Sequence, residues 1–595
     1  MDPVIVVGAG PVGLTLSLAL AAQGVPSVVL DEGPGTEEPR PARTVVLRED
    51  TADLVGRLGC RELDRVALRW AGWRSMRRKQ LVRNVPLDGG RRDGSRGDGG
   101  EAPLTGLLPA PLHVPQHALS AALRTAVERA PLIQRVPMSR IDMLEQDSGG
   151  VTVHTREPGS TWWRGSYLVG CDGARSTVRK LLDIRFPGRT AVERHAVAAL
   201  RAELPWPDVA VLHRRPPWRT GGAEVSARPL PDGVWRLDWL LPPQGELVTP
   251  EALVTRIRDT LAGWCGESPA YELLDTGVHT LHHRLARRWR KQRAFLAGDA
   301  AHLLGALGTQ GLDEGLRDAE NLAWKLAHAW HHGPAEHLLD SYQAERRAAV
   351  AARLRAADQS LPILRGGGGL RTLVPGAARG HDTLLADGHL GCGALGGAPS
   401  YSHSPLSPPH TEAHTVVGTP PGAPVSDVTV TAPDGTTARL RDRLGQGHPL
   451  VVLVAPGTGV WDRRHWQTAG IMPRLTEAVA ALPATTELLV TESYPGASAH
   501  TVLLVRPDGH LVAAFGGVRP AELLAAARAA LGGAPGTAQE PVQPGDGKNG
   551  KDGKEAGGGR DGGEAGGGGD GGDPSAGPEQ EPGVRFHADR AAGIN

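Results

Sequence analysis

The spacing of hydrophobic positions changes twice within the first thirty residues. Val4–Val7 is an unbroken apolar, β-branched run, which predicts a buried strand. Leu14 to Ala22 is apolar at helical spacing and is followed by Gly24, so it predicts a helix that ends there. Ser27–Leu30 predicts a second strand. Strand, helix and strand in this order indicate an α/β fold.

A second strand-to-helix pattern lies near the middle of the chain. Ala294 to Ala297 is an apolar run that predicts the end of a buried strand, and Asp299 and a Gly-rich bend from Gly305 to Gly311 follow it. Helical spacing then appears, and we expect Asp313 to be its N-cap. The apolar positions of this helix are Leu316, Ala319, Leu322, Ala323 and Leu326.

The segment between these two patterns predicts further strands and one helix. Val151–Thr155 and Trp162–Gly170 have strand character, and a helix opens at Gln116. Residues 185–290 alternate short apolar and polar stretches, which predicts an antiparallel sheet. Residues 337–360 continue as helix.

The C-terminal part predicts another α/β unit, followed by a tail. The expected strands are Val428–Val430, Leu450–Ala455, Thr486–Thr491 and Val502–Val505, and the expected helices are Leu475–Leu482 and Ala521–Leu531. Gly, Asp, Glu, Lys and Pro dominate residues 532–583, and few apolar residues occur between 88 and 103. Because such segments cannot bury a core, we expect a disordered Gly-rich tail over 532–595 and a surface insertion.

Composition excludes several classes of protein. The 595 residues suffice for three or four domains, and the formal net charge of +0 gives no field to attract nucleic acid or a membrane surface. The four cysteines are widely separated, without the pairs that zinc sites or disulfide scaffolds need. No signal peptide or membrane-spanning run is evident. We therefore expect a cytoplasmic protein.

The first turn carries the dinucleotide-binding fingerprint G-x-G-x-x-G in its required setting. A strand precedes it, a helix follows, and an acid lies about 20 residues on. The first glycine permits a tight turn, the second lets backbone approach a pyrophosphate, and the third lets helix and strand pack closely. Asp31 would bind the ribose hydroxyl, with Glu32 as the alternative acid. The fingerprint residues are Gly8, Ala9, Gly10, Pro11, Val12 and Gly13.

The stretch from Gly298 to His328 resembles the second FAD-binding motif of the flavoprotein aromatic hydroxylases, such as p-hydroxybenzoate, phenol and aromatic polyketide hydroxylases. The chain shares GDAAH, then Gly308, Gln310 and Gly311, and later DAxNLxWKL. It departs from the family pattern at four positions. Gly305 and Ala306 replace prolines, Thr309 replaces glycine and Asp313 replaces asparagine.

The resemblance implies which residues contact FAD. Asp299 would lie beside the ribityl chain, and the helix N-terminus would point at the flavin N1 and C2 carbonyl. Arg43 matches an arginine near the pyrophosphate, although an ordinary solvated arginine is an equally good interpretation. Gln116 matches a flavin contact, and the Asp-Gly motif at Asp172 would contact FAD and passing NADPH through Arg175 or Arg179. The remaining implied contacts, at the helix N-terminus, are Gly311, Leu312 and Asp313.

The resemblance also implies a Rossmann-like FAD-binding domain, an interleaved antiparallel substrate domain and a thioredoxin-like C-terminal domain without CxxC. The implied boundaries are 1–184 and 291–365 for the FAD-binding domain, 185–290 for the substrate domain and 415–531 for the thioredoxin-like domain.

The implied reaction is monooxygenation of a small aromatic, possibly polyketide, substrate. NADPH reduces FAD, O2 adds at flavin C4a, and the hydroperoxide delivers one oxygen atom. A Baeyer–Villiger oxygenase or epoxidase, an FAD oxidase or dehydrogenase, and an FAD-binding sensor remain alternatives. The sequence leaves open the catalytic residues and the choice between monomer and homodimer. His213, His279, His282 and His283 are possible acid–base groups, and the tryptophans Trp206, Trp218, Trp235 and Trp239 are expected mainly in the core.

Removal of the residues after about Leu531 should leave FAD content and the unfolding midpoint unchanged, because a disordered tail contributes no core. Flavin absorbance and thermal unfolding of the truncated and full-length proteins test this. A lower midpoint in the truncated protein would show that the tail packs on the fold.

Overall fold

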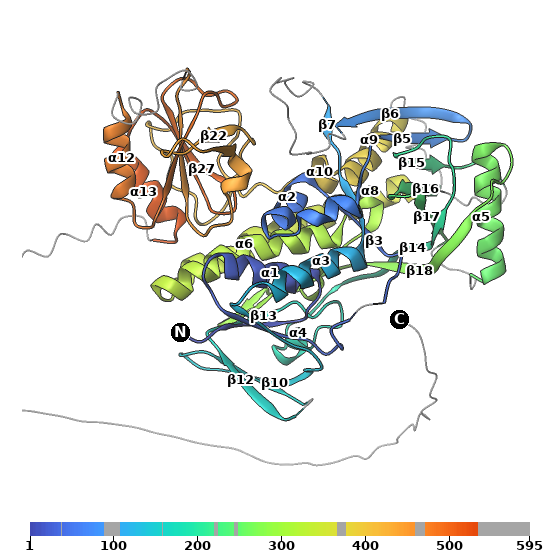
Figure 1. The fold of residues 1–595 in the computed structure, drawn as a ribbon, viewed down its shortest axis with the longest axis horizontal. Coiled ribbons are helices and arrows are strands. Elements are labelled where there is room, and N and C mark those ends of the chain that lie inside the picture. The colour runs from blue at the N-terminus through green and yellow to red at the C-terminus, as the bar shows by residue number, and fades with distance from the viewer. Residues whose placement is uncertain are drawn as a thin grey trace, which may run out of the picture. The chain divides into compact units, whose positions relative to one another are not determined.

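The computed structural model describes residues 1–36, 38–88, 107–156, 159–218, 224–242, 248–365, 377–457 and 470–533, without the side chains of 377–379. The predicted tail beyond 533 and almost all of the predicted insertion lie outside these residues. Within them the fold is mixed α/β with several sheets, as the sequence predicts (Figure 1).

A six-stranded sheet contains the two N-terminal strands. Its order is β19-β20-β13-β1-β2-β9, and every pair is parallel except β19 with β20. Because parallel strands run in register, the loops after β1, β2, β13 and β20 meet at one edge. The strands are β1 Val4–Val7, β2 Ser27–Leu30, β9 Ile133–Val136, β13 Tyr167–Gly170, β19 Arg290–Lys291 and β20 Ala294–Leu296.

Two helices pack closely beside this sheet, α1 (Pro11–Ala22) and α6 (Gly311–His332). Glycine is required where they meet, since a Cβ on Gly315 would lie 2.6 Å from Val12 Cγ2 and 3.1 Å from Gly298 Cα. Val12 of the N-terminal fingerprint therefore packs against Gly298 and Gly315 of the second strand-to-helix pattern. The two predicted patterns form one structural unit.

A nine-stranded sheet forms the second large layer, in the order β21-β18-β14-β17-β16-β15-β5-β6-β7. It is mainly antiparallel, as predicted, although β15 with β5 and β6 with β7 are parallel. It also takes in β5 to β7, which precede residue 184. Helix α5 (Pro250–Cys265) packs Leu253, Ile257 and Leu261 on its strands. The strands are β5 Gly72–Arg77, β6 Gln80–Asp88, β7 Leu108–Pro109, β14 Gly188–Arg201, β15 Val209–Arg214, β16 Glu224–Pro229, β17 Val234–Leu241, β18 Glu272–Leu285 and β21 His302–Leu303.

Two three-stranded antiparallel sheets complete this part, and one corrects a prediction. Trp162–Gly170 is two strands, not one, because the chain changes sheets at Gly165. There a Cβ would lie 2.7 Å from Pro3 O, so only glycine allows the crossing. The strands are β10 Ile141–Gln146, β11 Val151–Thr155 and β12 Thr161–Gly165 in one sheet, and β3 Thr44–Leu47, β4 Leu68–Arg69 and β8 Leu112–Pro115 in the other.

The predicted helix over 337–360 is α7, a π-helical turn at Gln343–Arg347, and α8 in succession. The helix predicted at Gln116 is confirmed as α3. The remaining helices of this part are α2 Glu49–Arg57, α3 Gln116–Glu128, α4 Thr177–Leu181, α7 Glu336–Tyr342, α8 Ala348–Arg365, α9 Ala377–Leu390 and α10 Gly393–Gly396.

The C-terminal segment forms a six-stranded sheet in the order β23-β22-β25-β24-β26-β27. Only β24 and β25 are parallel neighbours, and α12 and α13 pack together in one apolar core with the sheet. All predicted elements are present within a few residues. They are β22 Thr429–Thr431, β23 Thr437–Arg439, β24 Leu450–Val454, α12 Met472–Ala480, β25 Glu487–Thr491, β26 Thr501–Val505, β27 Leu511–Gly516 and α13 Pro520–Ala530.

A buried ion cluster joins the C-terminal sheet to α6. Arg506, in the turn between β26 and β27, bonds Glu345 of the π turn at 2.6 and 3.0 Å and Asp508 at 2.6 Å. Lys325 of α6 also donates to Glu345, at 2.6 Å. Asn321 donates to both acids, Glu345 and Asp508. Two buried cations face two buried carboxylates here, and breaking such pairs is costly. The turn therefore has to meet the face of α6 that carries Lys325 and Asn321.

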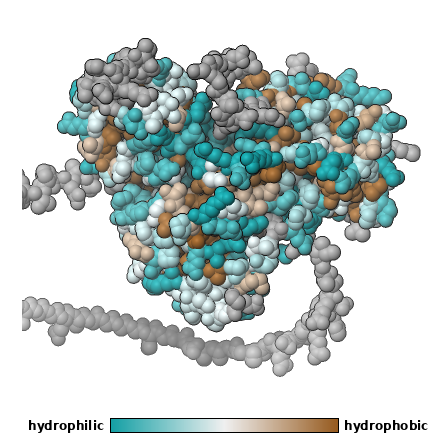
Figure 2. Space-filling model, in the orientation of Figure 1, coloured by the Kyte–Doolittle hydropathy of each residue, from teal (hydrophilic) through white to brown (hydrophobic). Residues whose placement is uncertain are grey.

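The face shown in Figure 2 is mostly hydrophilic, with scattered apolar residues. Among the described helices, none combines the length and apolar character that crossing a membrane requires.

Arg506→Met should lower the free energy of unfolding by ~3–5 kcal/mol, because it leaves two buried carboxylates facing one lysine. Urea denaturation measures this. Arg201→Met is the matched control, since Arg201 pairs with Glu272 on the exposed surface, and its effect should stay within ~1 kcal/mol. Equal effects of the two substitutions would contradict the role assigned to the cluster.

Candidate functional site

The glycine-rich turn after β1 requires glycine at two of its three fingerprint positions and leaves open space at the third. Gly8 has φ 106°, and a Cβ there would lie 2.5 Å from Cys171 O. A Cβ on Gly13 would lie 2.0 Å from Gly8 O, so helix and turn require glycine. Gly10, the N-cap of α1, has nothing within 4 Å of a built Cβ. Open space beside this backbone is what a pyrophosphate needs.

Asp31 lies at the end of β2 and binds the glycine-rich turn. One carboxylate oxygen accepts from Ala9 N at 2.6 Å, and the other accepts from Gly33 N at 2.7 Å. Glu32 is exposed, and its recorded ionic partner is Arg140 at 3.9 Å. The geometry therefore places Asp31, rather than Glu32, against the turn.

Arg43, Gln116 and Asp299 come together although they are far apart in sequence. The N–H of Gln116, the first residue of α3, donates to Arg43 O at 2.9 Å. Asp299 is reached by solvent yet surrounded by protein, and this partial desolvation raises its pKa against the lowering effect of His302 and Arg43. A Cβ on Gly311 would lie 3.8 Å from Asp299 Oδ1, so this acid lies beside the start of α6.

Helix α6 begins at Gly311 with Gln310 as N-cap, so the predicted N-cap at Asp313 is wrong. Asp313 lies within the first turn and points at α2 instead, where it accepts from Thr51 Oγ1 at 2.6 Å and pairs with Arg48 at 3.4 Å. Burial raises the pKa of Asp313, and Arg317 and Arg48 oppose this. The side chain of Gln310 makes no capping hydrogen bond, and within the described ranges the N–H groups of Gly311 and Leu312 stay available to a ligand.

Asp172 organises the Asp-Gly turn, as predicted. It accepts from Ser176 Oγ at 2.5 Å and from Val178 N at 2.9 Å, and burial raises its pKa. Arg179 donates to two carbonyls, those of Ala174 and Ala300, and is therefore occupied structurally. Arg175 is exposed, which leaves it as the arginine of this motif that can meet phosphate.

Several residues of the second motif contact each other rather than a ligand. Asp318 accepts from Gly298 N at 3.0 Å, from His302 Nε2 at 2.8 Å and from Arg346 Nε at 2.8 Å. All of these groups are buried. Asp318 thus ties the end of β20 to α6 and to the π turn.

These residues fit a dinucleotide that carries a flavin. Open space at Gly10, an uncapped helix N-terminus, and the solvent-reached Asp299 beside it all border the edge where the parallel strands end. Arg43 and Gln116 lie at the same place.

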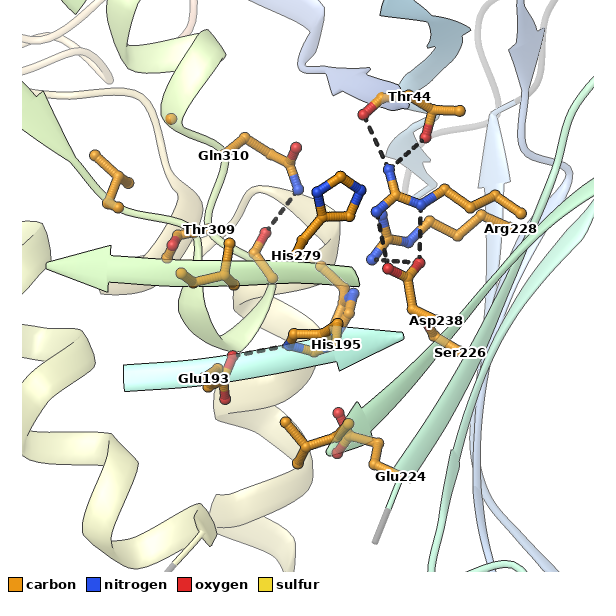
Figure 3. Close-up of a pocket in the computed structure, with 18 of the residues that line it drawn as sticks. Thr44, Glu193, His195, Glu224, Ser226, Arg228, Asp238, His279, Thr309 and Gln310 are labelled. Carbon is orange, nitrogen blue, oxygen red and sulfur yellow. Dashed lines mark hydrogen bonds and ion pairs between the residues drawn. The ribbon is translucent and has the colours of Figure 1, made fainter. Parts of the chain in front are cut away.

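A cavity of about 210 Å³ lies between the nine-stranded sheet and the loop before α6 (Figure 3). The loop contributes Leu304, Gly305 and Gly308 to Gly311, and the sheet contributes polar side chains from β14, β16, β17 and β18. Those side chains are Glu193, His195, Glu224, Ser226, Arg228, Arg236, Asp238 and His279.

Sequence reasoning missed the charged residues of this cavity, apart from His279. They alternate with core residues along their strands, as in Glu224, Ser226 and Arg228 on β16, so a period of two was the available signal. Glu193 accepts from Leu307 N at 3.1 Å and from Arg365 at 2.7 Å. Burial by itself would raise the pKa of Glu193, but His195 and Arg365 lower this pKa to about 2.

Of the four histidines named from the sequence, one lines the cavity. His213 bonds Arg78 O and accepts from Trp264, and His283 bonds Asp358 at 2.8 Å. His282 accepts from Ala191 N at 3.1 Å. His279 lines the cavity, and burial and Arg236 lower its pKa, which favours the neutral imidazole. Trp235 and Trp239 are core residues, as expected, and Trp206 and Trp218 pack against that core.

Comparison with known proteins identifies the family. The profile described as "FAD binding domain" matches residues 1–357. The chain belongs to this family. FAD is therefore its cofactor.

Two similar proteins are named as a hydroxylase and a monooxygenase. The chain is 32% identical over 362 residues to a 3-(3-hydroxy-phenyl)propionate/3-hydroxycinnamic acid hydroxylase of Mycobacterium sp. strain JLS, covering 58% of this chain and 57% of that protein. It is 33% identical over 367 residues to the rifampicin monooxygenase of Streptomyces venezuelae, covering 58% and 68% respectively. The match spans 57% of the length of the Mycobacterium hydroxylase, and 36% of the length of a hydroxylase of the same name from Paraburkholderia xenovorans.

Solved structures share the fold over most of the chain. The anhydrotetracycline hydroxylase OxyS of Streptomyces rimosus matches with TM-score 0.63 and 26% identity, over 89% of this chain and 99% of that one. The flavin-dependent monooxygenase PieE, in complex with FAD and substrate, matches with TM-score 0.67 and 22% identity, over 89% and 98%.

Gly10→Val should weaken FAD binding at least tenfold, or ~1.4 kcal/mol, because the new side chain enters the space left for pyrophosphate. FAD titration of the apoprotein measures this. Gly56→Val is the control, since Gly56 in α2 also has nothing within 4 Å of its built Cβ but lies away from the turn. Unchanged FAD affinity in Gly10→Val, with both variants folded, would refute the placement of the pyrophosphate.

Proposed function

We propose that the protein is a flavin monooxygenase that uses NAD(P)H and O2 to insert one oxygen atom into a small aromatic substrate. The observation that carries the proposal is the position of the cavity. Its one wall is the loop that leads into α6 and its other wall is the polar face of the nine-stranded sheet. A substrate there would lie next to the FAD-binding residues.

Bound FAD would supply the chemistry that activates O2, and the chain supplies binding and orientation. Gly10 would admit the pyrophosphate, and Asp31 would turn a carboxylate oxygen toward the ribose. Arg43 and Gln116 would border the cofactor beside Asp299. The uncapped N–H groups at Gly311 and Leu312 would stabilise negative charge on the reduced ring, an effect that helix dipoles favour.

The charge of Asp313 does not cancel this effect. Its carboxylate is directed toward Arg48 and Thr51 and is paired there, so the N-terminus of α6 keeps its positive character. A neutral asparagine is therefore not required at this position for the proposed chemistry.

The parts of the chain would divide the work as in the aromatic hydroxylases. Residues 1–184, apart from β5 to β7, and residues 291–365 would bind FAD, and the nine-stranded sheet, with β5 to β7, would bind substrate. The C-terminal sheet would be a thioredoxin-like module without thiol chemistry, since its described strands and helices contain no cysteine. NADPH would bind transiently, with exposed Arg175 meeting its phosphates.

The reaction should be tested with purified holoenzyme, NADPH and ¹⁸O2 against a panel of phenols, aromatic acids and aromatic polyketides. Mass spectrometry should find one labelled atom in the product, and NADPH oxidation should accelerate when the substrate is present. Asp299→Ala should impair FAD retention or its reduction while the fold remains.

Two outcomes would replace this function. If all oxygen leaves as hydrogen peroxide with every compound, the protein is an oxidase. If the label appears in the ring of a lactone formed from a ketone, the reaction is a Baeyer–Villiger oxygenation.

A further inference from the structure

A serine, a histidine and an aspartate form one hydrogen-bonded row on the small β10-β11-β12 sheet. His154 Nδ1 lies 2.6 Å from Asp142 Oδ1, and the other ring nitrogen, Nε2, lies 2.6 Å from Ser160 Oγ. Asp142 belongs to β10 and His154 to β11, and Ser160 directly precedes β12. None of these three residues lines the cavity described above. They are therefore a second group of reactive side chains, separate from the flavin chemistry.

A β-bulge brings the aspartate to the histidine. Ile141 pairs with Thr155 and Met143 pairs with His154, so Asp142 is an extra residue of β10 without a partner of its own in β11. In a regular strand, Asp142 and Met143 would point to opposite faces of the sheet. A bulge instead re-aims a side chain, and bulges are common beside active sites. Here it lets the carboxylate reach the imidazole that Met143 faces.

Asp142 determines which ring nitrogen of His154 carries the proton. Arg156 Nε also donates to this carboxylate, and the hydrogen bonds from Arg156 and His154 lower the pKa of Asp142. Because an ionised carboxylate only accepts hydrogen bonds, Nδ1 of His154 is the donor. In the neutral ring Nε2 then has a free lone pair, which accepts from the Ser160 hydroxyl. This is the arrangement in which an imidazole removes the proton of a nucleophilic serine.

The surroundings of the serine offer a substrate access and apolar surface. Ser160 is exposed, whereas only 8% of His154 is. Trp162 pairs with His154 across the strands, and the two ring centroids lie 4.9 Å apart. Trp162 remains 50% exposed and Met143, on the other side of His154, 43% exposed. An apolar group bound at Ser160 would therefore have an indole ring beside it.

We infer that Ser160 is an activated nucleophile that hydrolyses carboxylic esters with an apolar acyl or alcohol group. His154 would be the general base and acid, and Asp142 the positioning residue that orients the imidazole. This activity goes beyond the proposed function, since it uses neither FAD nor NAD(P)H.

The reaction balances with water as the only co-reactant. Ser160 Oγ attacks the ester carbonyl carbon and gives its proton to His154 Nε2. The bond between that carbon and the alcohol oxygen then breaks, and the departing alcohol takes the proton from Nε2. Water attacks the acyl-serine in the same way, with its proton passing to Nε2. The acyl–serine bond breaks, Ser160 Oγ takes the proton back, and a free carboxylic acid leaves.

The oxidised holoenzyme without NADPH is the material for the test. A fluorophosphonate probe, which phosphonylates activated serines, should modify Ser160, and peptide mass spectrometry should locate the label there. The same protein should hydrolyse 4-nitrophenyl butyrate, and release of 4-nitrophenolate should stop once Ser160 is labelled. The labelled protein should keep its FAD and its NADPH oxidation, because Ser160 belongs neither to the FAD site nor to the cavity.

Ser160→Ala should abolish both the labelling and the catalysed hydrolysis. Ser148→Ala is the matched control, because Ser148 is also an exposed serine beside a strand of this sheet, and it should change neither. Asp142→Asn should lower kcat at least ~tenfold with KM and unfolding temperature unchanged, because an amide favours the wrong imidazole tautomer. Asp142→Glu, which keeps the carboxylate, should recover part of kcat.

The absence of label on Ser160, or ester hydrolysis that persists in Ser160→Ala, overturns the inference. Equal labelling rates in the parent protein and in Asp142→Asn would also overturn it, because the hydrogen bonds of His154 would then only brace the strands.

Discussion

The fold around the cofactor edge depends on one buried carboxylate, that of Asp318. It receives a backbone N–H, an imidazole and a guanidinium, and the three residues that supply these groups are buried. Such a group is costly to bury, and full hydrogen bonding is what makes the burial tolerable. These hydrogen bonds hold α6 in place relative to the end of β20. The helix N-terminus and Asp299 are thereby held at the same edge.

The local sequence patterns near the N-terminus were sufficient to predict the structure there. The contacts between residues far apart in sequence could not be predicted in this way. β1, the glycine turn, α1 and β2 follow from neighbouring residues, so their prediction holds closely. The helix start at Gly311 was misplaced because capping depends on how the preceding loop folds. The cavity charges come from four strands and α8, and only the assembled fold brings them together. Pairing between β15 and β5 joins residues 137 positions apart, such as Val209 and Gly72, which no spacing rule indicates.

The departures from the hydroxylase motif are compensated within the same loop. Where the family has prolines, this chain has Gly305 and Ala306, which leave the backbone freer. Thr309, in place of glycine, is buried, and both its N–H and its hydroxyl donate to Ala306 O, at 3.1 and 2.8 Å. A hydrogen-bonded turn therefore does the stiffening that a proline ring would do.

Leu307 has φ 57° and ψ 27°, a left-handed conformation that a leucine adopts at a cost of about 1 kcal/mol. Its N–H is held by Glu193 from the opposite sheet, and Glu193 is held in turn by Arg365 at the end of α8. Three segments distant in sequence thus share one small polar set. Recombination between homologous genes can exchange the strand that carries Glu193 without the segments that carry Leu307 and Arg365. Crossover points that keep all three residues from one parent preserve these hydrogen bonds, and chimeras made in this way are the ones expected to work.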